Sequence, residues 1–402
     1  MLARANRRQF SRAQLPLRRP ERSLMPLFVI ANLLFGAISL AILGSGGYLL
    51  WSWWDGEQVR TLDGALVVMR EDWRLWIAVG LLSWSLLGRL VILPLITRSG
   101  EDTLKVKQSG EQINLPDHRR IHLEAFGPTH GQPIVLIHGW GLDRTIWSPI
   151  RERLALERRV YVLDLPGLGR SRRCDAQMVG LEAFAAVLSS LLDKIGHPAI
   201  VVGHSIGGMT LQTLVRDNPS AFNEKVAGAI LVNTTYTNPL RTMVASRLMQ
   251  ALRWPVLEPV LHLAIWLQPL AWLSAWQSYL SGSAHLANRL GFGAAVTRGQ
   301  LEHTTLLTTK NPPAALARGN LAMLRWDATG AIKAAAAPIL VIGGDRDIVT
   351  KHEASEYIAA SGLKVELRTV HGANHMGFLE QAAVYGDLIE RFADDNARAR
   401  PI

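Results

Sequence analysis

The arrangement in the sequence best suited to chemistry is a serine between two glycines, Ser205 in Gly203-His204-Ser205-Ile206-Gly207. An apolar, β-branched stretch at residues 199–202 precedes it, and apolar residues at helical spacing follow from Leu211. A strand, a sharp turn and a helix form the context in which a G-x-S-x-G serine acts as a nucleophile. Gly203 and Gly207 leave room for a strained turn, because a Cβ atom at either position would meet neighbouring backbone, so the motif predicts that Ser205 stands exposed above a sheet, beside a helix N-terminus.

A serine hydroxyl needs a base that takes its proton and an acid that orients the base. His375 is the predicted base, because it follows the last predicted strand in a short loop that contains glycine. Asp347 is the predicted acid, on the turn after the preceding strand. The chain order Ser205, Asp347, His375 is one of the orders in which such triads occur. His371 and Asp345 are the alternative base and the alternative acid.

The negative charge that develops on a carbonyl oxygen during acyl transfer needs hydrogen-bond donors that are already in place. The predicted donors are the backbone N–H of Ile206, directly after the serine, and that of Trp140. Trp140 lies in a His-Gly-Trp-Gly segment that follows the apolar residues 133–137. We interpret His138 as a structural residue of this loop, and Gly139 as the residue that lets the loop pass close to the serine.

The sequence predicts neither a metal site nor a cofactor. His371 and His375 have the spacing of metal ligands on a helix, but the adjacent Glu of the zincin pattern is absent and the segment is typical of a loop. Gly167-Leu168-Gly169 lacks the third glycine of a dinucleotide-binding turn, and the sequence contains no phosphate-binding lysine motif.

The candidate residues are spaced along a pattern of short strands that alternate with amphipathic helices, which predicts a mainly parallel α/β sheet. The predicted strands cover residues 120–126, 133–137, 160–163, 199–202, 228–232, 338–342 and 365–370. Each candidate residue follows a strand directly, which is where open parallel sheets place their sites. The alternation stops over residues 236–330, where Leu, Trp and Pro predict several helices inserted between two strands.

Two apolar runs precede this domain and predict a membrane hairpin. Residues 25–51 carry no charge, and at about 1.5 Å per residue such a helix exceeds a hydrocarbon core of roughly 30 Å. This run is too long for a signal peptide and lacks a cleavage site. Residues 73–97 form the second run, in which Arg89 would extend toward the interface; a re-entrant or surface-lying helix is the alternative. The acidic loop 52–72, between an arginine-rich arm at 1–24 and basic residues after the second run, favours two spans with the globular domain on the cytoplasmic side.

The bulk composition agrees with a membrane-attached globular protein. Of the 402 residues, 49% are hydrophobic and 19% charged, and 13 are Trp, while the net charge is +10. The basic arm lies next to an apolar run, so we expect it to contact anionic lipid and not nucleic acid. The single cysteine excludes an internal disulfide framework.

Taken together, these motifs resemble the α/β-hydrolase fold superfamily, and the membrane-anchored layout is similar to that of monoacylglycerol-lipase-like and esterase-like members. The resemblance is carried by His138-Gly139-Trp140-Gly141, Asp164-Leu165-Pro166-Gly167-Leu168-Gly169-Arg170-Ser171, Gly203-His204-Ser205-Ile206-Gly207-Gly208, Gly344-Asp345-Arg346-Asp347 and His375. It implies a mostly parallel, eight-stranded sheet over residues 98–402, with one antiparallel strand near its start and a helical lid at 236–330 between the sixth and seventh strands. It places the family's triad on Ser205, Asp347 and His375, and the oxyanion donors on Trp140 and Ile206. Members with an aspartate nucleophile are disfavoured by Ser205.

The sequence thus predicts a membrane-anchored serine hydrolase that cleaves a lipophilic carboxylic ester through an acyl-enzyme on Ser205. An acyltransferase, or another reaction on the same fold, is the alternative activity, and a non-catalytic scaffold is a third interpretation. The lid would line an acyl pocket, contact the bilayer surface or simply pack on the sheet. The expected partners are an ester substrate and membrane lipids.

Overall fold

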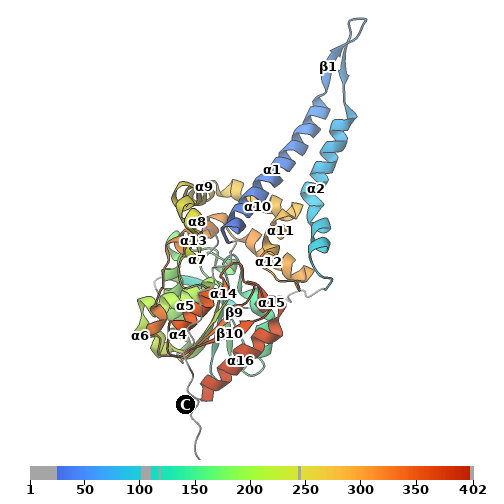
Figure 1. Cartoon of the computed structure of the whole chain (residues 1–402). Helices are drawn as coiled ribbons and strands as arrows, with labels where there is room; N and C mark the ends of the chain where they lie inside the picture. The colour runs from blue at the N-terminus through green and yellow to red at the C-terminus, as the bar shows by residue number, and fades with distance from the viewer. Residues whose placement is uncertain (1–24, 101–109, 117–118, 243–245, 399–402) are drawn as a thin grey trace, which may run out of the picture.

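The computed structural model describes residues 25–100, 110–116, 119–242 and 246–398, so the basic arm at 1–24 lies outside the described residues. A pair of long helices, α1 (Met25–Asp55) and α2 (Asp72–Ile96), projects from an α/β domain (Figure 1). The residues expected as a loop between them include a two-stranded antiparallel hairpin, β1 (Glu57–Arg60) and β2 (Leu66–Met69). This hairpin forms because Gly64, with φ of 86°, closes the turn.

Both projecting helices are long and apolar enough to cross a membrane, over Leu34–Asp55 and Asp72–Ile96. A bent pair of helices later in the chain would raise the number of candidate spans among the described residues from 2 to 3. The distal end of the helix pair carries tryptophans with arginines over their rings, Arg70 over Trp53 and Trp54. Tryptophan and arginine together are typical of a membrane–water interface.

The α/β domain is built on an eight-stranded sheet with the order β10-β9-β8-β7-β5-β6-β4-β3. Its strands are β3 (Glu111–Leu115), β4 (Arg119–Phe126), β5 (Ile134–Ile137), β6 (Val160–Leu163), β7 (Ala199–His204), β8 (Val226–Val232), β9 (Ile339–Gly344) and β10 (Val365–Val370). The pairs β3–β4 and β4–β6 are antiparallel and all other neighbouring pairs are parallel, so the predicted mostly parallel, eight-stranded sheet with one antiparallel strand near its start is confirmed.

Alternate residues of the central strands pack into two separate cores. Val135 and Val201 face one core with helices α4 (Leu181–Ile195), α5 (Ile206–Asp217), α6 (Pro219–Lys225) and α14 (His352–Ala360). Leu136 and Val202 face the other core with α3 (Ser148–Leu154), α15 (Gly377–Glu380) and α16 (Ala382–Arg398). Strands β5, β7, β8 and β9 are buried over their whole length, as expected for a sheet covered on both faces.

The connection between β8 and β9, the sixth and seventh strands of the sheet, is helical throughout its regular parts. It contains α7 (Pro239–Thr242), α8 (Ser246–Leu252), a π-helical turn at Arg253–Leu257, α9 (Glu258–Trp266), α10 (Gln268–Ser281), α11 (Ser283–Arg289), α12 (Arg298–Lys310) and α13 (Pro313–Arg325). We refer to these helices and the described residues that connect them as the lid. They lie between the sheet and the projecting helix pair (Figure 1), in the region predicted to be helical.

Candidate active site

Ser205 occupies the turn between β7 and α5, with φ of 52° and ψ of −114°. Residues other than glycine rarely adopt this conformation, which costs on the order of 1–3 kcal/mol and persists only where neighbours enforce it. Two contacts hold the turn: the Ser205 N–H donates to Val232 O at 3.0 Å, and Thr234 Oγ1 donates to Ser205 O at 2.7 Å. The sharp turn therefore presents the serine side chain at the carboxyl end of the central strand.

The glycines around Ser205 are required by close backbone packing. A Cβ atom at Gly203 would overlap the backbone of Gly207, and a Cβ at Gly207 would lie 2.6 Å from Ile137 O. Both glycines have ordinary negative φ, so they are needed here for space and not for backbone freedom.

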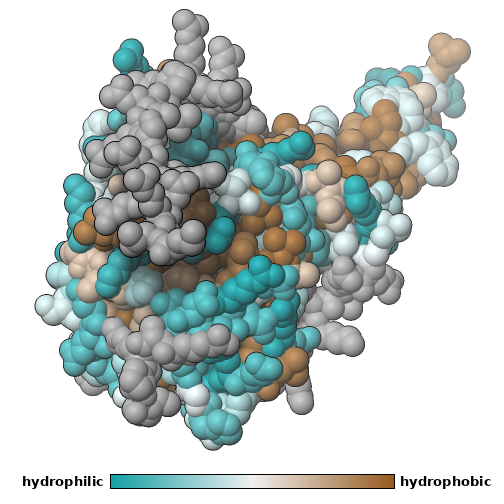
Figure 2. Space-filling view, turned by 60° about the horizontal axis from the view of Figure 1, so that its bottom comes forward, coloured by the Kyte–Doolittle hydropathy of each residue, from teal (hydrophilic) through white to brown (hydrophobic). Residues whose placement is uncertain are grey.

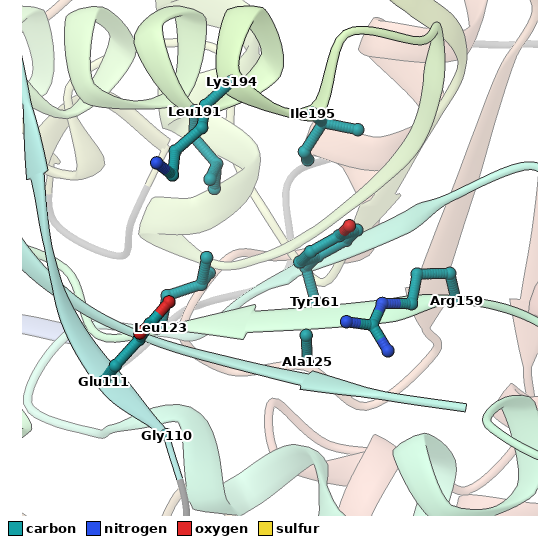
Figure 3. A pocket seen from close by; sticks show the side chains of 9 residues that line it. All are labelled: Gly110, Glu111, Leu123, Ala125, Arg159, Tyr161, Leu191, Lys194 and Ile195. Carbon is teal, nitrogen blue, oxygen red and sulfur yellow. The ribbon is translucent and has the colours of Figure 1, made fainter. Parts of the chain in front are cut away.

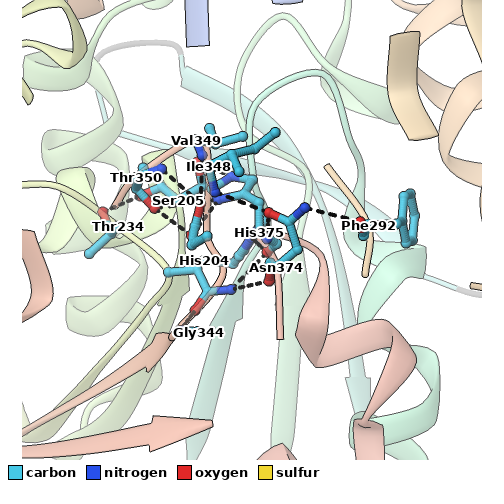
Figure 4. A network of polar contacts seen from close by, with 12 residues as sticks. His204, Ser205, Thr234, Phe292, Gly344, Ile348, Val349, Thr350, Asn374 and His375 are labelled. Carbon is cyan, nitrogen blue, oxygen red and sulfur yellow. Dashed lines mark hydrogen bonds and ion pairs between the residues drawn. The ribbon is translucent and has the colours of Figure 1, made fainter. Parts of the chain in front are cut away.

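The structure brings the three predicted residues together from three different loops. His375 Nε2 lies 3.1 Å from Ser205 Oγ, and His375 Nδ1 lies 3.0 Å from Asp347 Oδ2. Figure 4 shows Ser205 and His375 within one continuous network of polar contacts. With the Nδ1 proton donated to the carboxylate, Nε2 is the ring nitrogen available to accept the serine proton.

Asp347 is buried and held by its own loop. Its Oδ1 accepts hydrogen bonds from the N–H groups of Val349 and Thr350 at 2.7 and 2.8 Å, and its Oδ2 accepts one from Thr350 Oγ1 at 2.8 Å. Burial alone would raise the pKa of Asp347, but the charge of His375 and these hydrogen bonds outweigh burial and lower the pKa below its ordinary value. The carboxylate therefore stays ionised and can orient His375.

Two asparagines, which the sequence analysis did not single out, fix the histidine loop. Asn233 Nδ2 donates to Asn374 O at 3.0 Å and to His375 O at 2.9 Å. Asn374 Oδ1 accepts from the N–H groups of Ile348 and His375, at 3.1 and 2.8 Å, and so links the loop of the acid to that of the base (Figure 4). The sequence marks these two residues only by position, because Asn233 directly follows β8 and Asn374 directly precedes the predicted base His375.

Asn374 also ties the histidine loop to the lid, because its Nδ2 donates to Leu290 O and Phe292 O at 2.9 and 3.0 Å. His204 packs beneath the base, with 4.8 Å between the ring centroids of His204 and His375, and its Nε2 donates to His375 O at 3.1 Å. Burial, the larger cause, and the electrostatic repulsion of His375, the next, lower the pKa of His204 well below its ordinary value. The His204 ring is therefore neutral.

The alternative residues form a separate pair. His371 Nδ1 lies 3.0 Å from Asp345 Oδ2, and the His371 side chain is 87% exposed. Asp345 also accepts from the Gly372 N–H at 2.7 Å, so it shapes the turn that precedes the histidine loop. Neither residue has a hydrogen bond to Ser205 among the described contacts, whereas Asp347 and His375 are linked to it.

The predicted oxyanion donors are the N–H of the residue directly after the serine and an N–H in the loop that passes next to His204. Ile206 is the first residue of α5, so its N–H is one of those left free at a helix N-terminus. The loop that carries Trp140 passes so close that a Cβ at Gly139 would lie 2.5 Å from His204 Nδ1. Among the described residues, no protein acceptor is bound by the N–H of Trp140 or that of Ile206.

His138 has the structural position expected of it. Its Nε2 accepts from the Leu165 N–H at 2.9 Å and its Nδ1 donates to Gly139 O at 2.8 Å. Burial lowers the pKa of His138, which keeps the ring neutral. The same loop is held from the lid, because Asn311 Nδ2 donates to Gly141 O at 2.8 Å.

A hollow of about 430 Å³ lies elsewhere, between the β3–β4–β6 edge of the sheet and the end of α4 (Figure 3). Charged and aromatic side chains line it, including Glu111, Arg159, Tyr161 and Lys194, but no serine, cysteine or histidine does. Within the described residues, no group of three or more His, Cys, Asp or Glu side chains could hold a metal ion.

The sheet, the turn at Ser205 and the lid define a hydrolase, and the chain belongs to the alpha/beta hydrolase family, whose model matches residues 134–388. The match includes Ser205, Asp347 and His375 and begins after the projecting helix pair.

Two curated relatives are named as esterases. The chain is 24% identical over 273 residues to the pimeloyl-[acyl-carrier protein] methyl ester esterase of Yersinia pseudotuberculosis serotype O:1b (strain IP 31758), a match that covers 66% of this chain and 94% of the relative. It is 27% identical over 275 residues to the enzyme of that name from Xanthomonas oryzae pv. oryzae (strain MAFF 311018), covering 68% of this chain and 98% of the relative. Among solved structures, an esterase from Exiguobacterium antarcticum superposes with a TM-score of 0.58 at 17% identity, covering 71% of this chain and all (100%) of that chain.

Proposed function

We propose that this protein is a membrane-anchored serine esterase that hydrolyses carboxylic esters with an apolar acyl chain. The observation that carries the proposal is the hydrogen-bond sequence from Ser205 through His375 to Asp347, set on a strained turn at the carboxyl end of β7. A serine in contact with a histidine that has a buried, ionised carboxylate behind it is equipped for acyl transfer.

In the proposed reaction Ser205 Oγ attacks the ester carbonyl carbon while His375 Nε2 takes the hydroxyl proton. The oxygen of the tetrahedral intermediate accepts hydrogen bonds from the N–H groups of Trp140 and Ile206. His375 then protonates the departing alcohol, and the acyl group remains on Ser205. Water, deprotonated by His375, attacks the acyl-enzyme and releases the carboxylic acid and free Ser205. Asp347 holds the ring in the required tautomer throughout.

Two observations support an ester with an apolar acyl chain as substrate. The curated relatives are named for the methyl ester of an acyl chain, and the lid of this chain is rich in Leu and Trp. The candidate spans α1 and α2 support the membrane anchor. Because α1 and α2 form a helical hairpin and their flanking segments are basic, the hydrolase domain is assigned to the cytoplasmic side.

A fluorophosphonate probe, which phosphonylates activated serines, tests the proposal in membranes that contain the full-length chain. Wild type is expected to be labelled and Ser205→Ala not labelled, while the control Ser361→Ala, at a partly exposed serine directly after α14, is expected to be labelled as wild type. Turnover of a water-soluble short-chain ester should follow the same order. A folded wild type without labelling would overturn the esterase proposal, and labelling of Ser205→Ala would assign the nucleophile elsewhere.

A further inference from the structure

The lid and the projecting helix pair are packed so closely that they form one structural unit. Ser39 Oγ of α1 lies 3.0 Å from Ser281 Oγ and 2.9 Å from Ser283 Oγ of the lid. A Cβ at Gly36 of α1 would overlap the hydroxyl of Ser274, and a Cβ at Gly88 of α2 would overlap the backbone oxygen of Ser281. Small residues at such contacts allow helix backbones to approach closely, as they do between helices in membranes.

The charge of Arg89 in α2 is balanced by a carboxylate of the lid at this contact. Arg89, which is expected to extend toward the interface, donates to two lid residues, to Glu302 Oε1 at 2.6 Å and to Tyr279 Oη at 2.9 Å. The other carboxylate oxygen of Glu302 is 2.8 Å from His285 Nε2. An arginine in a spanning helix is tolerated when it is paired inside the protein in this way.

The length of the projecting helix pair places the lid relative to a bilayer. The distal tryptophans Trp54 and Trp73 mark one interface, and helical rise puts Gly36 about 27 Å and Gly88 about 22 Å from them. A hydrocarbon core is roughly 30 Å thick. If α1 and α2 span the bilayer, its core therefore extends past Gly36 and Gly88 to the level of the lid helices that pack on them.

The lid helices α9 and α10 have the exposed apolar surface that a position at the level of the hydrocarbon core requires. Helices α9 and α10 meet at a bend of 99°, next to Trp266, which is 79% exposed, while Leu263, Leu270 and Leu273 are also exposed. Residues 259–288 contain no Asp, Glu, Lys or Arg. Hydrophobic residues also run along the exposed surface of the projecting helix pair (Figure 2). Because the helix pair packs on the lid, the apolar surface of the pair and that of α9 and α10 belong to one packed unit.

The bent pair α9–α10 does not form a third span. The lid leaves the sheet after β8 and returns at β9, and these two strands pair directly in the same sheet. A single crossing would place them on opposite sides of the membrane. A segment that enters and leaves on one side, with a sharp bend between two apolar arms, is re-entrant or lies in the interface.

We infer that the bend between α9 and α10 is embedded in the bilayer leaflet next to the hydrolase domain, so that the lid is a lipid-contacting surface beside Ser205. This inference rests on the proposed membrane anchoring. Embedding gives the exposed tryptophans and leucines an apolar environment. It also lets an ester dissolved in the bilayer reach the lid without crossing water, in accord with the proposed substrate class.

Site-specific labelling of the full-length chain in phosphatidylcholine vesicles tests the position of the bend. With the single cysteine removed by Cys174→Ser, a polarity-sensitive fluorophore is attached to Trp266→Cys, Leu270→Cys, Leu87→Cys in α2, and Leu363→Cys. Leu363 is the matched control, because it is fully exposed and lies before β10, at the edge of the sheet opposite Ser205. Quenching by lipid-borne nitroxide is expected at 266, 270 and 87 and not at 363.

The outcomes of this experiment separate the inference from the proposed function. Labels at 266 and 270 in water with the label at 87 in lipid would overturn the inference and leave the anchor intact. A label at 87 in water would overturn both the anchor and the inference. The esterase proposal is judged independently, by fluorophosphonate labelling of Ser205.

Hydrolysis rates for a membrane-incorporated and a water-soluble ester test whether the embedded bend gives substrate in the bilayer access to the site. The double variant Trp266→Glu/Leu270→Glu is expected to hydrolyse a long-chain ester incorporated in the vesicles about tenfold more slowly, because carboxylates keep the bend out of the hydrocarbon. Its turnover of a water-soluble short-chain ester should match wild type, and Leu363→Glu should match wild type with both esters. An equal loss with both esters, or no loss with either, would overturn the inference.

Discussion

The reactivity proposed for Ser205 depends on the contacts of its neighbours more than on the serine itself. His375 has Asp347 on one ring nitrogen and Ser205 on the other, while His204 packs beneath it and Asn233 holds its backbone carbonyl. Since the pKa of Asp347 is lowered and that of His204 is lowered well below its ordinary value, the charged group that His375 contacts in the described part of the chain is the Asp347 carboxylate, whereas the His204 ring is neutral. Such preorganised charge stabilises the imidazolium that forms as the proton moves.

At this scale we predict that Asp347→Asn lowers kcat for a short-chain ester by about 10³- to 10⁴-fold, because the amide favours the wrong tautomer of His375. The matched control is Asp345→Asn, in the alternative pair with the exposed His371. It should retain activity close to wild type. Steady-state kinetics of the two variants in detergent measure the difference, and a comparable loss in both would contradict the assignment of the acid.

At the scale of elements, the carboxyl ends of the parallel strands determine where the chemistry lies. Thr350, Asn233 and Asn374 all lie in loops that follow a strand of the sheet, and each contacts the acid or the histidine loop. Among the hydrogen bonds that join the lid to this edge of the sheet are one from Asn374 to Leu290 O and one from Asn311 to Gly141 O. The lid is therefore bonded to the loop of the base and to the loop of the proposed oxyanion donor.

We expect Asn311→Ala to lower kcat about tenfold with little change in thermal stability, because Gly141 and the adjacent Trp140 N–H lose their fixed position. Asn311 Oδ1 also accepts from the Gly169 N–H at 3.0 Å, so the side chain joins two loops. Asn223 joins two backbone groups in the same manner, at Ala334 and Ala336, but far from Ser205. Kinetics and thermal melting of both alanine variants test this, and a loss of kcat at Asn223→Ala as large as that at Asn311→Ala would refute it.

At the scale of the whole molecule, the projecting helix pair and the lid are coupled through Arg89 and Glu302. Both side chains are partly buried, 30% and 28% exposed, and Tyr279 and His285 complete the group. Removing one member of such a group leaves the opposite charge without its partner, which costs more than the loss of an exposed ion pair. The helix pair is thus part of the packed structure and not only a tether.

Accordingly, Arg89→Leu is predicted to destabilise the detergent-solubilised protein by on the order of 2 kcal/mol. Adding Glu302→Gln should recover part of this loss, because the unpaired charge is removed while Tyr279 keeps an acceptor. The control, Arg153→Leu, removes the more exposed contacts with Asp387 and Glu390 and should have a smaller effect. Thermal unfolding in one detergent compares the three, and equal shifts for Arg89→Leu and Arg153→Leu would contradict the coupling.

The sequence by itself determined the features that depend on local patterns. Gly-His-Ser-Ile-Gly between a strand and a helix predicted the turn at Ser205, and apolar length predicted the helices α1 and α2, because turn strain and helix length are local properties. The family resemblance supplied the number of strands. The short edge strand β3 was not among the strands read from the residues, since only Ile113 and Leu115 face the core and its pattern is correspondingly weak.

Only the tertiary structure decided which distant groups meet. The site contacts are made by Asn233, Asn374 and Thr350, and Arg89 pairs with Glu302. No periodic pattern in the sequence relates these residues to their partners, because side-chain contacts between elements follow from sheet order and lid packing. The structure likewise paired Asp347 with His375 and Asp345 with His371. Local motifs such as the turn at Ser205 could thus be predicted from the sequence, whereas contacts between residues distant in sequence could be identified only from the folded structure.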